Sequence, residues 1–129
     1  MTAGVPESSI ARELLGAAGR LMVKRTPGTR GLWPRATALL ARQSLEVALK
    51  TYWSAVAPGV EDASMRAQLL CLEGYLPPAV ARDAHHVWTA LSRASHHHAY
   101  ELSPTWDELA GWCRTVGEVV EQTERAWRR

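Results

Sequence analysis

The chain of 129 residues has no Phe, only two Cys and almost no excess of charge of either sign. Two cysteines far apart in sequence cannot form a disulfide framework, so we expect a protein of the reducing cytoplasm. Fifteen Lys and Arg against 13 Asp and Glu give a formal net charge of +2. This balance argues against a strongly basic nucleic-acid-binding arm, although it leaves room for a local basic groove.

Long apolar runs are also missing. None approaches the roughly 20 residues that a helix needs to cross a bilayer, so we expect no membrane contact. The first ten residues lack the basic and then apolar pattern of a signal peptide. No repeat of 20–50 residues is visible, which argues against a solenoid.

The hydrophobic residues, 47% of the chain, recur at helical spacing nearly throughout, and no convincing strand appears. We therefore predict a single all-α domain over residues 1–129, an antiparallel bundle of four main helices plus one short helix. Capping residues, Pro and Gly set the expected boundaries. The first helix is expected to start at Ser8 or Ser9 and to end at Thr26-Pro27-Gly28, and the second to start at Trp33-Pro34 and to end at Pro58-Gly59. A short helix is expected over about 62–72, the fourth helix after Pro77-Pro78, and the last helix from Ser103-Pro104.

The second expected helix has two apolar faces, one through Leu40 and Val47 and another through Leu45, Leu49 and Trp53. A helix that is apolar on more than one side is buried on more than one side. We expect it at the centre of the bundle.

The unusual local feature is the run from Arg93 to Tyr100, at the junction before the last helix, with consecutive imidazoles at His96, His97 and His98. Arginine offers a permanent planar cation suited to phosphate. Histidine gives or takes a proton near neutral pH. Together these groups could bind a phosphodiester and move a proton to or from an adjacent hydroxyl.

Arg93, His98 and Tyr100 have the spacing R-x-x-x-x-H-x-Y, and this part of the chain resembles HEPN domains, specifically the HepT-like toxins. The following segment, residues 100–106, is similar to the turn into the final helix of those proteins. Upstream, residues 43–50 resemble the pattern of their second helix, with an acidic residue four before a Lys. The resemblance covers roughly residues 35–117.

This resemblance implies a bacterial, metal-independent endoribonuclease that acts as a homodimer on RNA and needs no cofactor. Arg93 would hold the scissile phosphate, and His98 would assist the proton transfer that lets the ribose 2′-hydroxyl attack. The products would carry 2′,3′-cyclic phosphate ends. Tyr100 occupies the place where a partner nucleotidyltransferase, the antitoxin, modifies and silences such toxins.

Two alternatives remain open from the residues. His97 is four residues after Arg93 and would share its face if the helix continued, whereas the motif spacing favours His98, with His96 and His97 as possible support. Ala94 stands where many members of the family have Asn, Asp or His. That departure favours the alternative function, a non-catalytic HEPN-fold module that binds a protein or nucleotide partner. In that case a tryptophan would serve the interface: Trp53, Trp88 or Trp112.

Other chemistry finds less support. His85 lies about 16 Å before His96 along a helix with a rise of 1.5 Å per residue, so the two cannot share a metal ion within one helix. No C-x-x-C or H-E-x-x-H spacing indicates zinc, and Cys113 falls on an apolar stripe where we expect a core residue. Six further arginines are scattered between acids and are expected mostly on solvated helix faces: Arg25, Arg30, Arg35, Arg42, Arg82 and Arg114.

Overall fold

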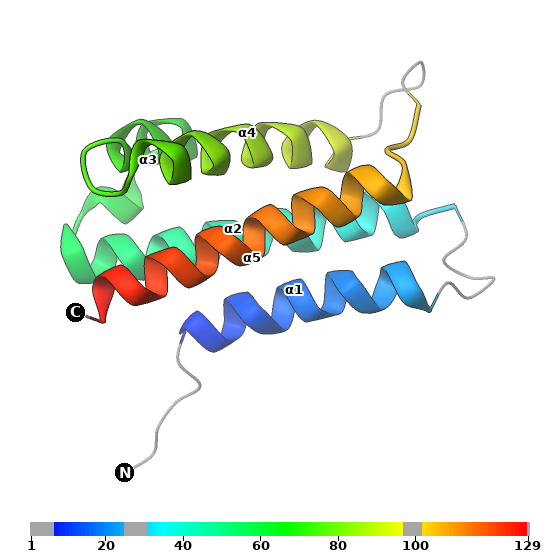
Figure 1. Cartoon of the computed structure of the whole chain (residues 1–129), viewed down its shortest axis with the longest axis horizontal. Coiled ribbons are helices and arrows are strands. Elements are labelled where there is room, and N and C mark those ends of the chain that lie inside the picture. The colour runs from blue at the N-terminus through cyan, green and yellow to red at the C-terminus, as the bar shows by residue number, and fades with distance from the viewer. Residues whose placement is uncertain (1–6, 25–30, 97–101, 129) are drawn as a thin grey trace, which may run out of the picture.

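The computed structural model describes residues 7–24, 31–96 and 102–128, and within these ranges it contains five α-helices and no strand (Figure 1). The all-α prediction is confirmed. A single turn of 3-10 helix, η2 (Val60–Asp62), precedes the short helix. The helices are α1 (Glu7–Val23), α2 (Trp33–Val56), α3 (Met65–Leu72), α4 (Pro78–Ser95) and α5 (Trp106–Trp127).

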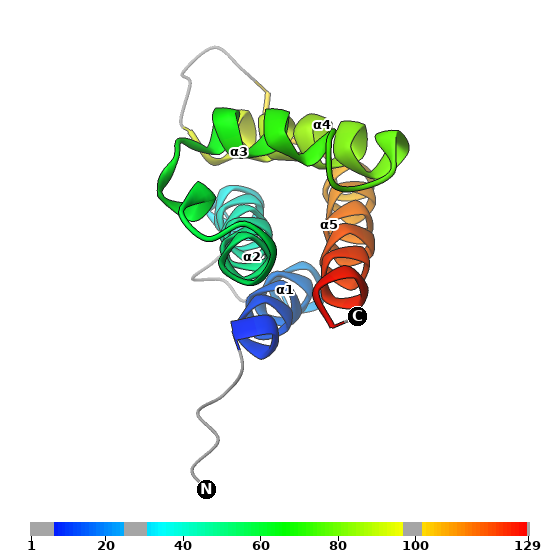
Figure 2. The same ribbon diagram turned by 90° about the vertical axis from the view of Figure 1, so that its left-hand side faces the viewer.

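Helix α2 lies at the centre and packs against α1, α4 and α5. The four long helices run alternately in opposite directions along the chain (Figure 1). Figure 2 looks nearly down α1, α2 and α5, and in this view α4 lies across them. The expectation that the second helix is buried on more than one side is confirmed by its contacts with three helices. Of its two expected apolar faces, the one through Leu45, Leu49 and Trp53 is fully buried, whereas Leu40 and Val47 are half-buried.

Small side chains allow α1 and α2 to approach closely. Buried alanines lie on both helices at the contact, including Ala11 on α1 and Ala41 on α2. The hydroxyl of Ser44 on α2 donates a hydrogen bond of 2.6 Å to the carbonyl oxygen of Ala11. A buried polar group is tolerated where it is hydrogen-bonded, so this bond also fixes the register of the two helices.

The start of α5 differs from the expectation. Thr105 and not Ser103 is the N-cap: its Oγ1 accepts from the Glu108 N–H at 3.1 Å, and Glu108 Oε1 accepts from the Thr105 N–H at 2.9 Å. This reciprocal capping box satisfies two backbone donors at once, which a Ser-Pro start does not. Helix α1 likewise starts earlier than expected, at Glu7, so Ser8 and Ser9 fall inside its first turn.

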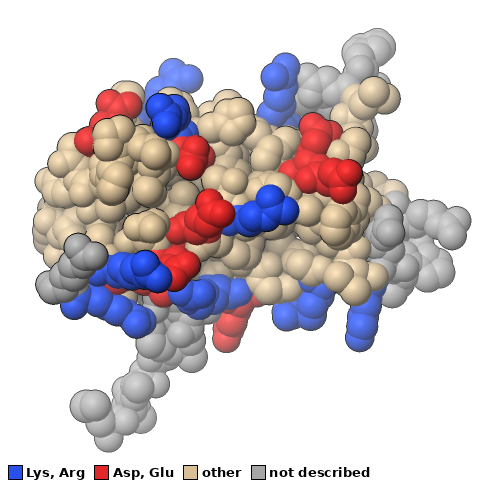
Figure 3. All heavy atoms as spheres, in the orientation of Figure 1, with Lys and Arg blue, Asp and Glu red and all other residues tan. Residues whose placement is uncertain are grey.

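Charged side chains of both signs are intermixed over the face that α1, α4 and α5 form (Figure 3). No field of one sign covers it, in keeping with the small net charge. Among the described residues, no helix is both long enough and apolar enough to span a membrane.

Candidate functional site in a groove between α4 and α5

Arg93 lies in the last turn of α4, and the helix ends two residues later at Ser95. A cation at this position interacts favourably with the helix dipole. Its side chain is exposed, and it takes part in an interaction with its surroundings. The predicted junction between helix and loop is therefore confirmed at the residue that opens the motif.

The rest of the predicted cluster is described only in part. His96 is the C-cap of α4, with an extended backbone (φ −92°, ψ 141°) and an exposed side chain. His97, His98 and Tyr100 lie outside the described residues. Because α4 ends at Ser95 and His96 has an extended backbone, the helical spacing that starts at Arg93 does not extend beyond Ser95.

A groove of about 900 Å³ runs between α4, the segment 102–105 and the first turns of α5. Its volume falls in the upper part of the range of roughly 300–1,000 Å³ that ligand sites occupy. Helix α4 contributes two adjacent rows of residues, each with a spacing of four, which therefore lie along one side of the helix. The rows are His85, Thr89 and Arg93, and His86, Ala90 and Ala94.

The opposite wall comes from α5 and the residues that lead into it. Trp112 is half-buried and supplies an aromatic surface one turn after Glu108, which belongs to the capping box. Glu108 is the one acidic side chain among the described residues of the groove. The residues of this wall are Leu102, Ser103, Pro104, Thr105, Glu108 and Trp112.

A polar network on the other side of α4 fixes the end of the helix that carries Arg93. Arg42 of α2 donates from Nη1 to Ser95 Oγ at 3.0 Å, and its Nε lies 3.9 Å from Glu46 Oε2. Trp88 Nε1 donates to the same carboxylate oxygen at 3.1 Å. Arg42 is thus a largely buried link between two helices, with 21% of its side chain exposed, and the expectation of a solvated face is wrong for it.

The tryptophans proposed for an interface fall into three different environments. Trp53 is fully buried and makes edge-to-face contacts with Tyr52 and Tyr75, so it cannot serve a partner surface. Trp88 is half-buried and engaged with Glu46. Trp112 alone of the three lines the groove.

The structure therefore brings together residues that the sequence kept apart. His85 and His86 were considered only as metal ligands, yet they line the same groove as Arg93. The spacing of four between His85, Thr89 and Arg93 is a signal that could have revealed this row. In the part of the chain that the structure describes, no group of three or more His, Cys, Asp or Glu side chains is arranged to hold a metal ion.

Comparison with known proteins identified no relative whose site could be compared with this groove. No protein-family model matches the chain. No curated protein is significantly similar to it in sequence. No solved structure matches it either.

Proposed function

We propose that the protein is a metal-independent endoribonuclease that cleaves RNA with Arg93 and His98, as the HEPN resemblance implies. One observation carries the proposal: Arg93 lines the groove from the last turn of α4, directly before the chain leaves the helix. An arginine of the motif therefore borders a space large enough for a nucleotide, and the motif runs on from there toward His98.

In this mechanism the guanidinium of Arg93 binds the scissile phosphodiester through two parallel hydrogen bonds and offsets the charge that grows on its oxygens. His98 takes the proton from the ribose 2′-hydroxyl as that oxygen attacks phosphorus. The bond from phosphorus to the 5′-oxygen breaks, and the leaving oxygen takes a proton from an acid or from water. The products are a 2′,3′-cyclic phosphate and a free 5′-hydroxyl.

The proposal extends to partners in the same way. The protein would act as a homodimer in a bacterial cytoplasm, with two copies of the motif facing each other. A nucleotidyltransferase would silence it by transferring a nucleotide to Tyr100. Each of these statements rests on the resemblance and on the motif residues that carry it.

A second candidate is a non-catalytic binding module of the same fold. Ala94 lines the groove beside Arg93 and brings no polar group to it. A site without that polar neighbour has less means to orient a reacting group, although it can still bind a ligand. Cleavage, and not binding, separates the two candidates.

The deciding experiment is an RNA cleavage assay in EDTA with purified protein. It compares the wild type with Arg93→Ala, His98→Ala and Arg66→Ala, the last an exposed arginine of α3 outside the groove. We expect the wild type and Arg66→Ala to cut, leaving cyclic phosphate ends, and the other two variants to lose at least about 100-fold in rate.

Absence of cleavage by the wild type across tRNA, mRNA and total RNA would favour the binding module. Equal cleavage by all four proteins would indicate a contaminating ribonuclease and remove the proposed site. The mass of the species that cleaves, measured by light scattering at micromolar concentration, tests the homodimer separately.

A further inference from the structure

The groove has an apolar floor and a polar rim. Ala90 and Ala94 of α4 are half-buried, and Trp112 of α5 is half-buried opposite them. Small residues on one helix facing a large aromatic residue on the other leave space over the aromatic surface. A flat apolar group of a ligand is the complement of such a floor.

The rim carries positive or protonatable groups. Arg93 carries a guanidinium, and His85 and His86 are exposed imidazoles on the same side of α4. The acid on the facing helix, Glu108, has one carboxylate oxygen already bound by the Thr105 backbone N–H. The rim therefore offers an anion one guanidinium and two imidazoles, while Glu108 keeps its negative charge on the facing wall.

A ligand that has a flat apolar part and an adjacent anionic part would fit both the apolar floor and the rim. A nucleotide unit of a single strand has this composition: its base stacks on an aromatic residue and its phosphate binds arginine. His85 and Arg93 are separated by about 12 Å along α4, since each residue adds 1.5 Å, so the rim extends beyond a single phosphate.

We propose that this groove is a subsite for single-stranded RNA in which Trp112 stacks on a nucleobase next to the phosphate that Arg93 binds. The inference rests on the proposed function for its choice of RNA, and it adds the base-binding residue and the groove that the motif alone does not identify. Trp112 acts in binding and touches no reacting atom.

The test measures binding without cleavage. The probe is a fluorescein-labelled hexanucleotide with 2′-O-methyl riboses, which lacks the attacking hydroxyl, and a second probe has the same backbone without bases. Fluorescence anisotropy gives the affinity of wild type, Trp112→Leu, Trp112→Phe and Ala90→Leu. The matched control is Trp127→Leu, which alters another half-buried tryptophan of α5 outside the groove.

We expect Trp112→Leu to weaken binding of the first probe roughly tenfold, in line with the loss of one stacked base. Trp112→Phe keeps an aromatic ring and should retain most of the affinity. Ala90→Leu fills the groove without removing a core residue and should weaken binding as much as Trp112→Leu. Trp127→Leu should bind as the wild type does, and the probe without bases should bind every protein equally weakly.

Thermal unfolding followed by circular dichroism establishes whether each variant is folded. If Trp112→Leu does not fold, Ala90→Leu still tests the inference. Equal affinity of wild type and Ala90→Leu would overturn the inference, and so would equal affinity for the two probes. Competition by an acidic peptide as strong as that by the oligonucleotide would overturn it in favour of a protein ligand. Tight, Trp112-dependent binding with no RNA cleavage would instead refute the proposed nuclease and leave the subsite standing.

Discussion

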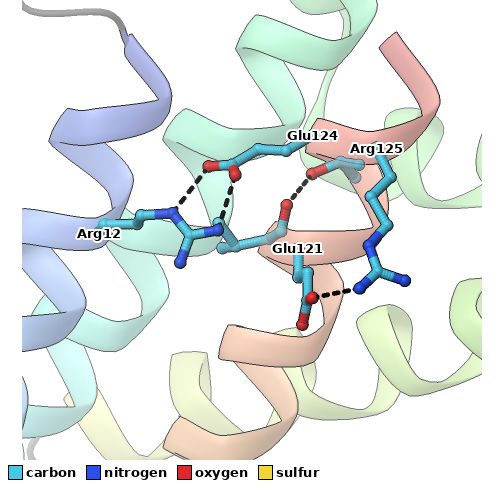
Figure 4. Close-up of polar contacts among 6 residues, drawn as sticks. Arg12, Glu121, Glu124 and Arg125 are labelled. Carbon is cyan, nitrogen blue, oxygen red and sulfur yellow. Dashed lines mark hydrogen bonds and ion pairs between the residues drawn. The ribbon is translucent and has the colours of Figure 1, made fainter. Parts of the chain in front are cut away.

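Arg12 of α1 holds the carboxylate of Glu124 on α5 with two hydrogen bonds, Nε to Oε1 at 3.1 Å and Nη2 to Oε2 at 2.7 Å (Figure 4). Glu124 is 8% exposed, so its carboxylate is poorly solvated by water and depends on the hydrogen bonds from Arg12. The pairing raises the pKa of Arg12 above its usual value, chiefly through the hydrogen bond to Glu124. The pair joins residues 112 positions apart in the sequence.

Replacement of Arg12 by Leu should lower the free energy of unfolding by about 1–2 kcal/mol, because it leaves the carboxylate of Glu124 without its charged partner. The matched control is Arg125→Leu, which breaks the exposed pair of Arg125 with Glu121 (2.6 Å) on the surface of α5 (Figure 4). Exposed pairs of this spacing contribute about 0.3–0.5 kcal/mol. Urea unfolding of both variants measures the difference, and an equal loss would contradict the special role of Arg12.

The two cysteines should react at different rates. Cys71 is exposed, whereas burial raises the pKa of the half-buried Cys113 thiol and so lowers its thiolate fraction. Iodoacetamide at pH 8 should alkylate Cys113 several-fold more slowly, as followed by peptide mass spectrometry. In urea the two alkylation rates should converge. Alkylation of Cys113 as fast as that of Cys71 in the folded protein would contradict the prediction and would show that α5 opens readily.

Stability should depend on pH through Glu61, which follows the end of α2. Glu61 accepts hydrogen bonds from Ser54 Oγ at 2.7 Å and from the Gly59 N–H, and these bonds lower its pKa, the Ser54 bond most. A carboxyl with a depressed pKa in the folded state stabilises above its unfolded pKa, near 4.3, and loses this contribution as pH falls through the folded value.

Glu61→Gln should therefore lower the urea midpoint at pH 7 and change it less at pH 3. The matched control is Glu118→Gln, which removes another carboxylate on the exposed side of α5. The prediction would be contradicted if Glu61→Gln lowered the urea midpoint relative to wild type by as much at pH 3 as at pH 7.

Two glycines should respond to alanine in opposite directions. Gly59 has a φ of +108° between α2 and η2, a conformation that side chains with a Cβ disfavour. Gly59→Ala should cost about 1–2 kcal/mol of stability. Gly19 lies within α1, where an added Cβ meets nothing within 4 Å, and Gly19→Ala should add about 0.5–1 kcal/mol. Unfolding curves of the two variants give the signs, and a gain from Gly59→Ala would contradict the argument.

Periodicity predicted the helices because their apolar faces are read from local spacing. It failed at the start of α5, where Ser103-Pro104 and Thr105 with Glu108 are competing start signals of the same kind, and only the hydrogen bonds decide for Thr105. Arg42 shows a second limit. A cation among polar neighbours looks solvated in sequence, and its burial depends on how α4 crosses α2.

The candidate site likewise has one part that could be predicted from the sequence and one part that could not. The sequence placed Arg93 at the end of a helix, and a spacing of four on that helix contains the information that His85 lies in the same row. The contribution of Trp112 and Glu108 depends on which turn of α5 faces α4. That choice is made by tertiary packing, which no local pattern encodes.

The capping box of α5 has a consequence for the ligand as well as for the helix. Thr105 and Glu108 tie a carboxylate to its own backbone at the wall of the groove. The one acidic side chain among the described residues of the groove is therefore held at the start of α5, and a ligand meets it in that position. The residue pair that starts the helix thus also sets where this wall of the groove carries its negative charge.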